Sequence, residues 1–252
     1  MKILISPAKS LNFEKALPTQ IYSESAFLKG SKKVHSVLKK KKPNELIELM
    51  SISDNLAQLN WERNQQWKLP FTPENARPAL YAFDGDVYTG LDAYSIEADK
   101  FDQIQDRLRI LSGLYGYLKP FDLIQPYRLE MGTSLAIGQH KNLYEFWKLK
   151  LTTSLNKELK TEDFLVNLAS QEYFSVLDSK KIIIPIITPE FKDYKDGKLK
   201  MISFFAKKAR GLMVRFIIDN NVQTIDGLKN FNSEGYRFDD NLSTGNQLVF
   251  TR

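Results

Sequence analysis

Apolar and polar positions change their spacing several times along this chain, as is typical of a protein that mixes strands and helices. Lys2–Ser6 is a short, mostly apolar run that stops at Pro7, which predicts a buried first strand. Similar runs at Ala79–Phe83, Phe164–Ala169 and Lys181–Ile187 predict further strands.

Helical spacing is predicted in five stretches: Ser23–Leu38, a helix starting near Pro43, Ser53–Gln66, Asp99–Leu108 and Phe204–Asn220.

The last of these predicted helices carries two informative faces. Phe205, Ala209, Leu212 and Phe216 recur at steps of three and four, which predicts a buried stripe. On another face lies Gly211, and a glycine inside a helix costs about 1 kcal/mol relative to alanine. We therefore expect another backbone or a ligand to approach this helix closely at Gly211.

Residues typical of turns separate several of the predicted strands and helices. The glycines within Asp84–Leu91 stand at positions typical of turns. Near the C-terminus, apolar and polar residues alternate on both sides of the turn-rich segment Asn241–Asn246, which predicts a β-hairpin. No repeat or low-complexity linker separates these elements, so we predict a single domain over 1–252 in the mixed α/β (α+β) class, with a mixed β core wrapped by helices.

Composition restricts the possible chemistry. The chain of 252 residues is 42% hydrophobic and 26% charged, as in ordinary globular proteins, and it contains no cysteine and only two histidines. Thiol chemistry is excluded, and we expect no metal site and no cofactor. No uncharged apolar run is long enough for a membrane span or a signal peptide, so we expect a cytoplasmic protein without a membrane partner.

The net charge of +6 is unevenly distributed. Residues 1–42 contain ten lysines and two glutamates, a net charge of +8, so residues 43–252 sum to −2. Four of these lysines form the run Lys39–Lys42, which is interpreted either as a solvated helix end or as an accessory contact for nucleic acid. Another cluster, Gly197–Ile218, holds six cations and no carboxylate.

Common catalytic signatures are absent, including a phosphate-binding P-loop, a nucleophile elbow and a zinc-protease motif, and no catalytic residue is assigned. The glycine spacing in Asp102–Met131 instead suggests two helices joined by a hairpin, an element that can bind a phosphate through backbone N–H groups. The residues that this hairpin would place near DNA are Gly113, Leu114, Tyr115, Gly116 and Lys119. A strand that enters a tight turn fits the same residues, and Pro120 interrupts the second helix.

Several motifs, in order along the chain, carry a resemblance to a known family. They are Ile5-Ser6-Pro7-Ala8-Lys9, Phe83-Asp84-Gly85-Asp86-Val87-Tyr88-Thr89-Gly90-Leu91, Leu111-Ser112-Gly113-Leu114-Tyr115-Gly116, Gln125-Pro126-Tyr127-Arg128-Leu129-Glu130-Met131-Gly132, Asn167-Leu168-Ala169-Ser170, Ala206-Lys207-Lys208-Ala209-Arg210-Gly211 and Asn232-Ser233-Glu234-Gly235-Tyr236. Together they resemble the peroxide stress protein YaaA family over nearly the whole chain.

The resemblance implies a bacterial protein of the peroxide response that limits iron-dependent DNA damage. It also implies a single-domain fold likened to a cantaloupe, and double-stranded DNA binding without marked sequence specificity through a helix-hairpin-helix in a basic cleft. The cations that match the family's segments, or lie beside them, are Lys9, Arg128, Lys207, Lys208, Arg210 and Arg215. Because the chain has no cysteine and few histidines, we expect any effect on iron to be indirect.

A different class of function stays open. Polar side chains stand inside or beside apolar runs at Ser6, Glu130, Asn167, Ser170 and Glu172. If they converge with Lys9, Arg128 and Lys207, they form a pocket for a nucleotide or a phosphorylated metabolite, in which a carboxylate is available as a general base. A buried network of ion pairs and hydrogen bonds would explain the same residues. No protein partner is predicted.

Overall fold

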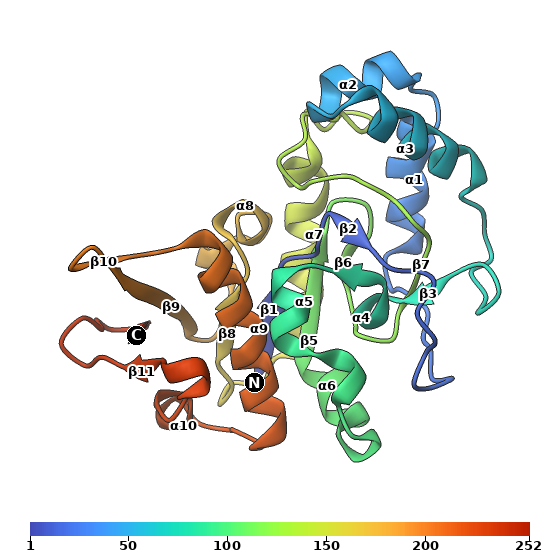
Figure 1. Cartoon of the computed structure of the whole chain (residues 1–252). Coiled ribbons are helices and arrows are strands. Elements are labelled where there is room, and N and C mark those ends of the chain that lie inside the picture. Colours follow the sequence, from blue (N-terminus) through green and yellow to red (C-terminus); the bar gives the residue numbers. More distant parts are fainter.

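The computed structural model describes all residues from 1 to 252, and one mixed β-sheet runs through its centre (Figure 1). Its strands are β1 (Lys2–Ile5), β5 (Leu108–Ser112), β6 (Gly116–Leu118), β8 (Leu165–Leu168), β9 (Ile186–Lys195), β10 (Lys198–Lys200), β11 (Arg237–Phe238) and β12 (Gln247–Thr251). They lie in the order β11-β12-β9-β8-β1-β5-β6, and β10 pairs with β9. Strands β12, β9, β8, β1 and β5 are mutually parallel.

Two of the apolar runs in the sequence form the two middle strands of the sheet, β1 and β8. Every residue of β1 and β8 is buried, because helices and loops cover both faces of a parallel sheet. The strands predicted at Lys2–Ser6 and Phe164–Ala169 are thus confirmed.

Helices and short 3-10 segments surround the sheet. The helices are α1 (Leu28–Leu38), α2 (Pro43–Met50), α3 (Asp54–Gln66), α4 (Ala79–Ala82), α5 (Asp86–Leu91), α6 (Phe101–Arg107), α7 (Leu143–Glu158), α8 (Gln171–Phe174), α9 (Ser203–Asp219) and α10 (Ile225–Lys229). The 3-10 segments are Ala93–Ser95, Ala98–Lys100, Ser179–Lys181 and Ser233–Gly235. Two small antiparallel pairs complete the fold: β2 (Ser10–Leu11) with β4 (Phe83–Asp84), and β3 (Arg77–Pro78) with β7 (Leu123–Ile124).

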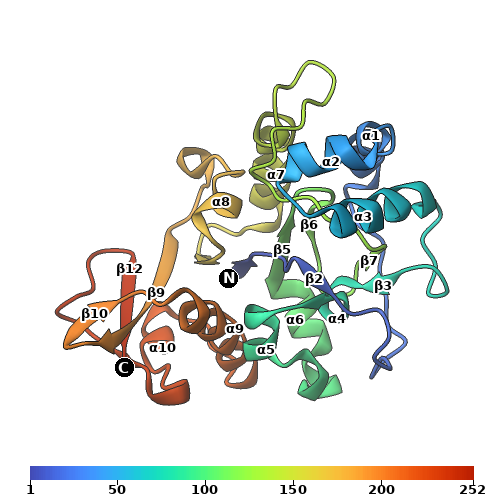
Figure 2. The same cartoon turned by 45° about the horizontal axis from the view of Figure 1, so that its top comes forward.

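The predicted mixed α/β class is confirmed. In both views α1, α2 and α3 lie together on one side of the molecule, and α10 and β10 lie on the other (Figures 1 and 2). None of the helices combines the length and the apolar character that crossing a bilayer requires.

Three local predictions were wrong. In the predicted strand Ala79–Phe83, the first four residues form helix α4 instead. The strand predicted at Lys181–Ile187 begins only at Ile186. Gly90, expected at a turn, lies inside helix α5, whereas Gly85 directly precedes that helix. All four residues of α4 are buried, so its sequence has no polar face by which to distinguish a helix from a strand.

The predicted C-terminal hairpin is confirmed. Strands β11 and β12 pair antiparallel, with Phe238 opposite Phe250. The helix predicted at Phe204–Asn220 is also confirmed as α9, but its buried stripe is different. Ala206, Ala209 and Met213 are buried, whereas Phe205 is 37% exposed.

Gly211 faces the core because α9 packs directly on α5 through two glycines. A Cβ atom at Gly211 would lie 1.8 Å from the carbonyl oxygen of Val87, and one at Gly90 would lie 2.1 Å from that of Lys208. Neither position has room for a side chain, so helix–helix packing explains Gly211. Both views show α5 and α9 side by side (Figures 1 and 2).

We predict that Gly211→Val destabilises the protein by about 3 kcal/mol, because the valine forces α5 and α9 apart. Chemical denaturation followed by circular dichroism measures this change. The matched control is Thr153→Val, at an exposed position of α7, which we expect to change stability by less than about 0.5 kcal/mol. Equal stability of the two variants would contradict the close contact.

Candidate functional site

A cavity of about 510 Å³ opens at the carboxyl ends of β1 and β8. Its walls come from the loop after β1, the β4–α5 segment, the start of α8, and α9. The predicted polar residues that line it are Ser6, Lys9, Glu130, Ser170, Glu172, Lys207 and Arg210. We call it the strand-end cavity.

Two serines join the neighbouring strands in the strand-end cavity. The backbone N–H of Ser170 donates to Oγ of Ser6 at 2.9 Å, and the two hydroxyl oxygens lie 3.3 Å apart. The hydroxyl of Tyr88 donates to the carbonyl oxygen of Ser6 at 3.2 Å. These contacts hold the loop after β1 against the loop after β8.

One carboxylate neutralises two of the predicted cations. Glu130 pairs with Lys9 at 2.8 Å and with Arg128 at 3.5 Å. In contrast, Lys207 and Arg210 line the strand-end cavity without an ion pair or a side-chain hydrogen bond to the protein. Burial lowers the pKa of Arg210, and the nearby Glu190 opposes that shift.

Sequence reasoning missed part of the strand-end cavity. Asp84, Asp86, Tyr88 and Tyr173 also line it. The antiparallel pairing of β2 with β4 brings Asp84 beside the loop after β1, and this long-range pairing left no local signal. Burial raises the pKa of the Tyr88 and Tyr173 hydroxyls well above the usual range, so both stay neutral and can donate a hydrogen bond.

Asn167 does not reach this cavity. It is buried in β8, where its Oδ1 accepts the backbone N–H of Ala169 at 3.1 Å. Its amide therefore shapes the end of the strand. No group of three or more histidine, aspartate or glutamate side chains lies close enough together to hold a metal ion.

Comparison with known proteins places the whole chain in one group. The family model for peroxide stress protein YaaA matches residues 1–242. The chain belongs to the YaaA family. A UPF0246 protein of Flavobacterium johnsoniae is 71% identical over 252 residues, covering all of both chains. UPF0246 proteins of Flavobacterium psychrophilum and Hahella chejuensis are 67% and 52% identical, over all of this chain and at least 99% of theirs.

The family resemblance of the sequence is thus confirmed, but Asp102–Met131 of this YaaA-family chain does not form two helices. Helix α6 ends at Arg107, and β5 and β6 follow as an antiparallel hairpin. The turn residues Gly113, Leu114, Tyr115 and Gly116 are buried, and Nε1 of Trp147 donates to the carbonyl oxygen of Gly113 at 2.9 Å. Half-buried Lys119 follows the hairpin. Burial in the core leaves these turn residues no surface for a DNA phosphate.

The structure contains a helical hairpin elsewhere. Helices α2 and α3 are neighbours joined by the short segment Ser51–Ser53, in which Ser51 adopts a left-handed backbone. The residue pattern did not distinguish this pair from two independent surface helices.

Two further predicted cations of α9 lie in ion pairs. Lys208 pairs with Glu234, and Nε of Arg215 bonds Asp219 at 2.6 Å. Nη1 of Arg215 also donates to Oγ of Ser95 at 2.6 Å. Of the six predicted cleft cations, only Lys207 and Arg210 are left without a carboxylate partner.

Unpaired cations gather instead on α1. Its exposed face carries Lys29, Lys32 and Lys33, and Lys39 and Lys40 follow the helix end. Lys150 of α7 lies close to Lys33, and partial burial together with this like charge lowers its pKa. These six residues form no ion pair, and we call them the α1–α7 lysine surface.

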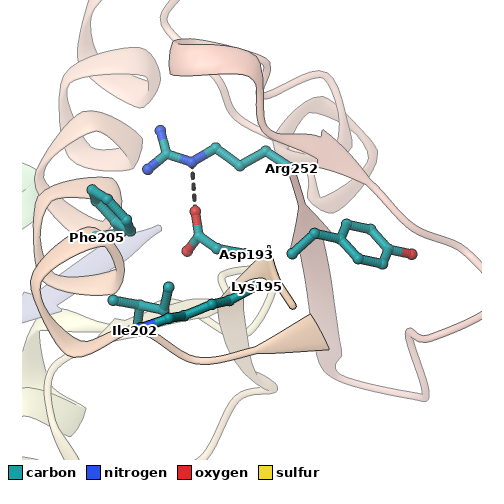
Figure 3. A pocket seen from close by; sticks show the side chains of 6 residues that line it. Asp193, Lys195, Ile202, Phe205 and Arg252 are labelled. Carbon is teal, nitrogen blue, oxygen red and sulfur yellow. Dashed lines mark hydrogen bonds and ion pairs between the residues drawn. The ribbon is translucent and has the colours of Figure 1, made fainter. Parts of the chain in front are cut away.

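A second cavity, of about 520 Å³, lies between β9, the C-terminus and α9 (Figure 3). Nε of Arg252 donates to Oδ1 of Asp193 at 2.6 Å across it, and Phe205 and Ile202 line one side. Its buried carboxylate and arginine neutralise each other. The charge left over in this cavity is that of Lys195, an exposed lysine on its rim.

The serine contact generates a stability prediction. Ser6→Ala removes the acceptor for the backbone N–H of Ser170, and loss of this partly buried hydrogen bond costs about 1 kcal/mol. We expect denaturant unfolding to show this loss. Ser36→Ala, at an exposed position of α1, is the control and should be nearly neutral. A neutral Ser6→Ala would show that water replaces the serine acceptor.

Proposed function

We propose that this peroxide stress protein binds double-stranded DNA in the cytoplasm, without sequence specificity, and thereby limits iron-dependent damage to it. One observation supports the proposal best: the α1–α7 lysine surface is a set of exposed cations without carboxylate partners. Like charges held together repel, and a polyanion relieves that repulsion while it releases its own counterions.

The geometry of α1 suits a backbone contact. Lys29 and Lys33 stand four residues apart, which places them on one face of α1, and Lys40 follows just beyond the end of the helix. Flexible lysine side chains contact phosphates without reading bases. The proposal therefore moves the main contact from the α9 cations and the buried hairpin to α1. Lys39 and Lys40 of the run Lys39–Lys42 are part of it, whereas Lys41 pairs with Glu45.

The link to iron follows from the same contact. Ferrous ion is attracted to the phosphate backbone, where its reaction with peroxide damages the adjacent sugar and base. Lysines that occupy these phosphates displace the cation, so the protein needs no iron ligand of its own.

We expect the triple variant Lys29→Gln, Lys33→Gln, Lys40→Gln to bind duplex DNA more weakly. The slope of log affinity against log salt should become shallower by about 0.9 for each phosphate that the variant no longer neutralises. Fluorescence anisotropy with a labelled mixed-sequence duplex, titrated across salt concentrations, measures both quantities.

The matched control is Lys208→Gln with Arg215→Gln, which removes two cations that the protein already pairs. We expect it to leave the affinity nearly unchanged. If this control weakens binding and the triple variant does not, α9 is the DNA surface. If the unaltered protein binds no duplex at low salt, the proposal fails.

A further inference from the structure

The strand-end cavity lies where the direction of chain connection reverses in the sheet. From β1 the chain proceeds to β5 on one side, whereas β8 lies on the other side of β1 and leads outward to β9. In open parallel sheets the loops at such a point turn away from each other and leave a crevice at the carboxyl ends of the strands, where ligands bind. Ser6 and Ser170 stand at the ends of these two strands.

The charges in the cavity are unusual because the protein leaves several of them uncompensated. Lys207 is exposed and Arg210 is half-buried, and neither has an acceptor in the protein. A guanidinium carries five N–H donors, and a partly buried one normally has protein acceptors. An anion of the ligand would supply them.

Glu130 and Glu172 of the same cavity have donors in the protein, whereas the other two carboxylates that line it do not. Asp84 and Asp86 line it, and their side chains accept no hydrogen bond from the protein. Both stay outside the ion pairs that neutralise Glu130, Lys208 and Arg215. A ligand that fits therefore carries an anionic group for the cations and several hydrogen-bond donors for the carboxylates.

We propose that the strand-end cavity binds a sugar phosphate, such as the ribose phosphate of a nucleotide. The phosphate contacts Lys207 and Arg210, and the sugar hydroxyls donate to Asp84 and Asp86. Carboxylates near the ends of parallel strands bind ribose hydroxyls in other sheets of this kind. The volume of about 510 Å³ is in the range of small-molecule sites.

This site is separate from the proposed DNA surface. None of the residues of the α1–α7 lysine surface lines the strand-end cavity. A single phosphate ligand thus does not need the lysines of α1, and a duplex does not need the cavity.

Isothermal titration calorimetry with ribose 5-phosphate, ribose, inorganic phosphate and phosphoethanolamine tests the proposal. We expect saturable binding of ribose 5-phosphate, tighter than that of the other three probes. Lys207→Gln and Arg210→Gln should each weaken it by about tenfold, as is typical for loss of a charge-assisted hydrogen bond. Lys198→Gln, an exposed lysine of β10 outside the cavity, should not.

The sugar contact has its own test. Asp86→Asn should weaken ribose 5-phosphate without weakening inorganic phosphate, whose affinity should stay equal or rise because a like charge is removed from the cavity. Tighter binding of phosphoethanolamine than of ribose 5-phosphate would overturn the sugar assignment, because the carboxylates would then prefer an ammonium group. Absence of saturable binding up to millimolar ribose 5-phosphate would overturn the site itself.

The two proposals fail independently. The triple lysine variant of α1 should keep the affinity for ribose 5-phosphate, and Lys207→Gln should keep most of the affinity for duplex DNA. Since Lys207 is exposed, its replacement tests the cavity even if Arg210→Gln proves unstable.

Discussion

The backbone contact between α5 and α9 determines much of this structure. Gly90 and Gly211 let the two helices approach until a Cβ atom on either would overlap a carbonyl group. Because of this contact, α9 turns Ala206, Ala209 and Met213 inward. Lys207 and Arg210 then lie at the mouth of the strand-end cavity, beside the segment that carries Asp86. A side chain at either glycine would displace the cationic wall of the cavity as well as the helix.

Ion pairing divides the cations of this chain into two groups. Lys9, Arg128, Lys208 and Arg215 have carboxylate partners, so their charge contributes to local structure. The lysines of α1 have no such partners. Surface ion pairs contribute little stability, but they reduce the positive electrostatic potential that would attract a polyanion to the protein surface. The net charge of +6 therefore says less about a nucleic-acid partner than the positions of the unpaired lysines do.

The strand-end cavity is assembled from segments that are far apart in the chain. Ser6, Asp86, Ser170 and Arg210 come from four separate elements, and the parallel pairing of β1 with β8 brings the first and third together. The name of the YaaA family indicates a role in peroxide stress, but it does not indicate which ligand this cavity binds. Its uncompensated cations and carboxylates are a property of the assembled fold.

Local sequence patterns were enough to predict the family and the elements with a clear apolar period. Buried strands such as Lys2–Ile5, the long helix Ser203–Asp219 and the C-terminal hairpin follow from such patterns, because burial on a strand or on one face of a helix leaves a regular apolar spacing. Other features depend on contacts between distant parts of the chain. Gly113–Gly116 carries a spacing compatible with either a helical or a strand hairpin, and packing against Trp147 in the core selected the strand form. Local sequence likewise cannot show which cations have carboxylate partners, because Lys208 and Glu234 meet across 26 residues through the fold.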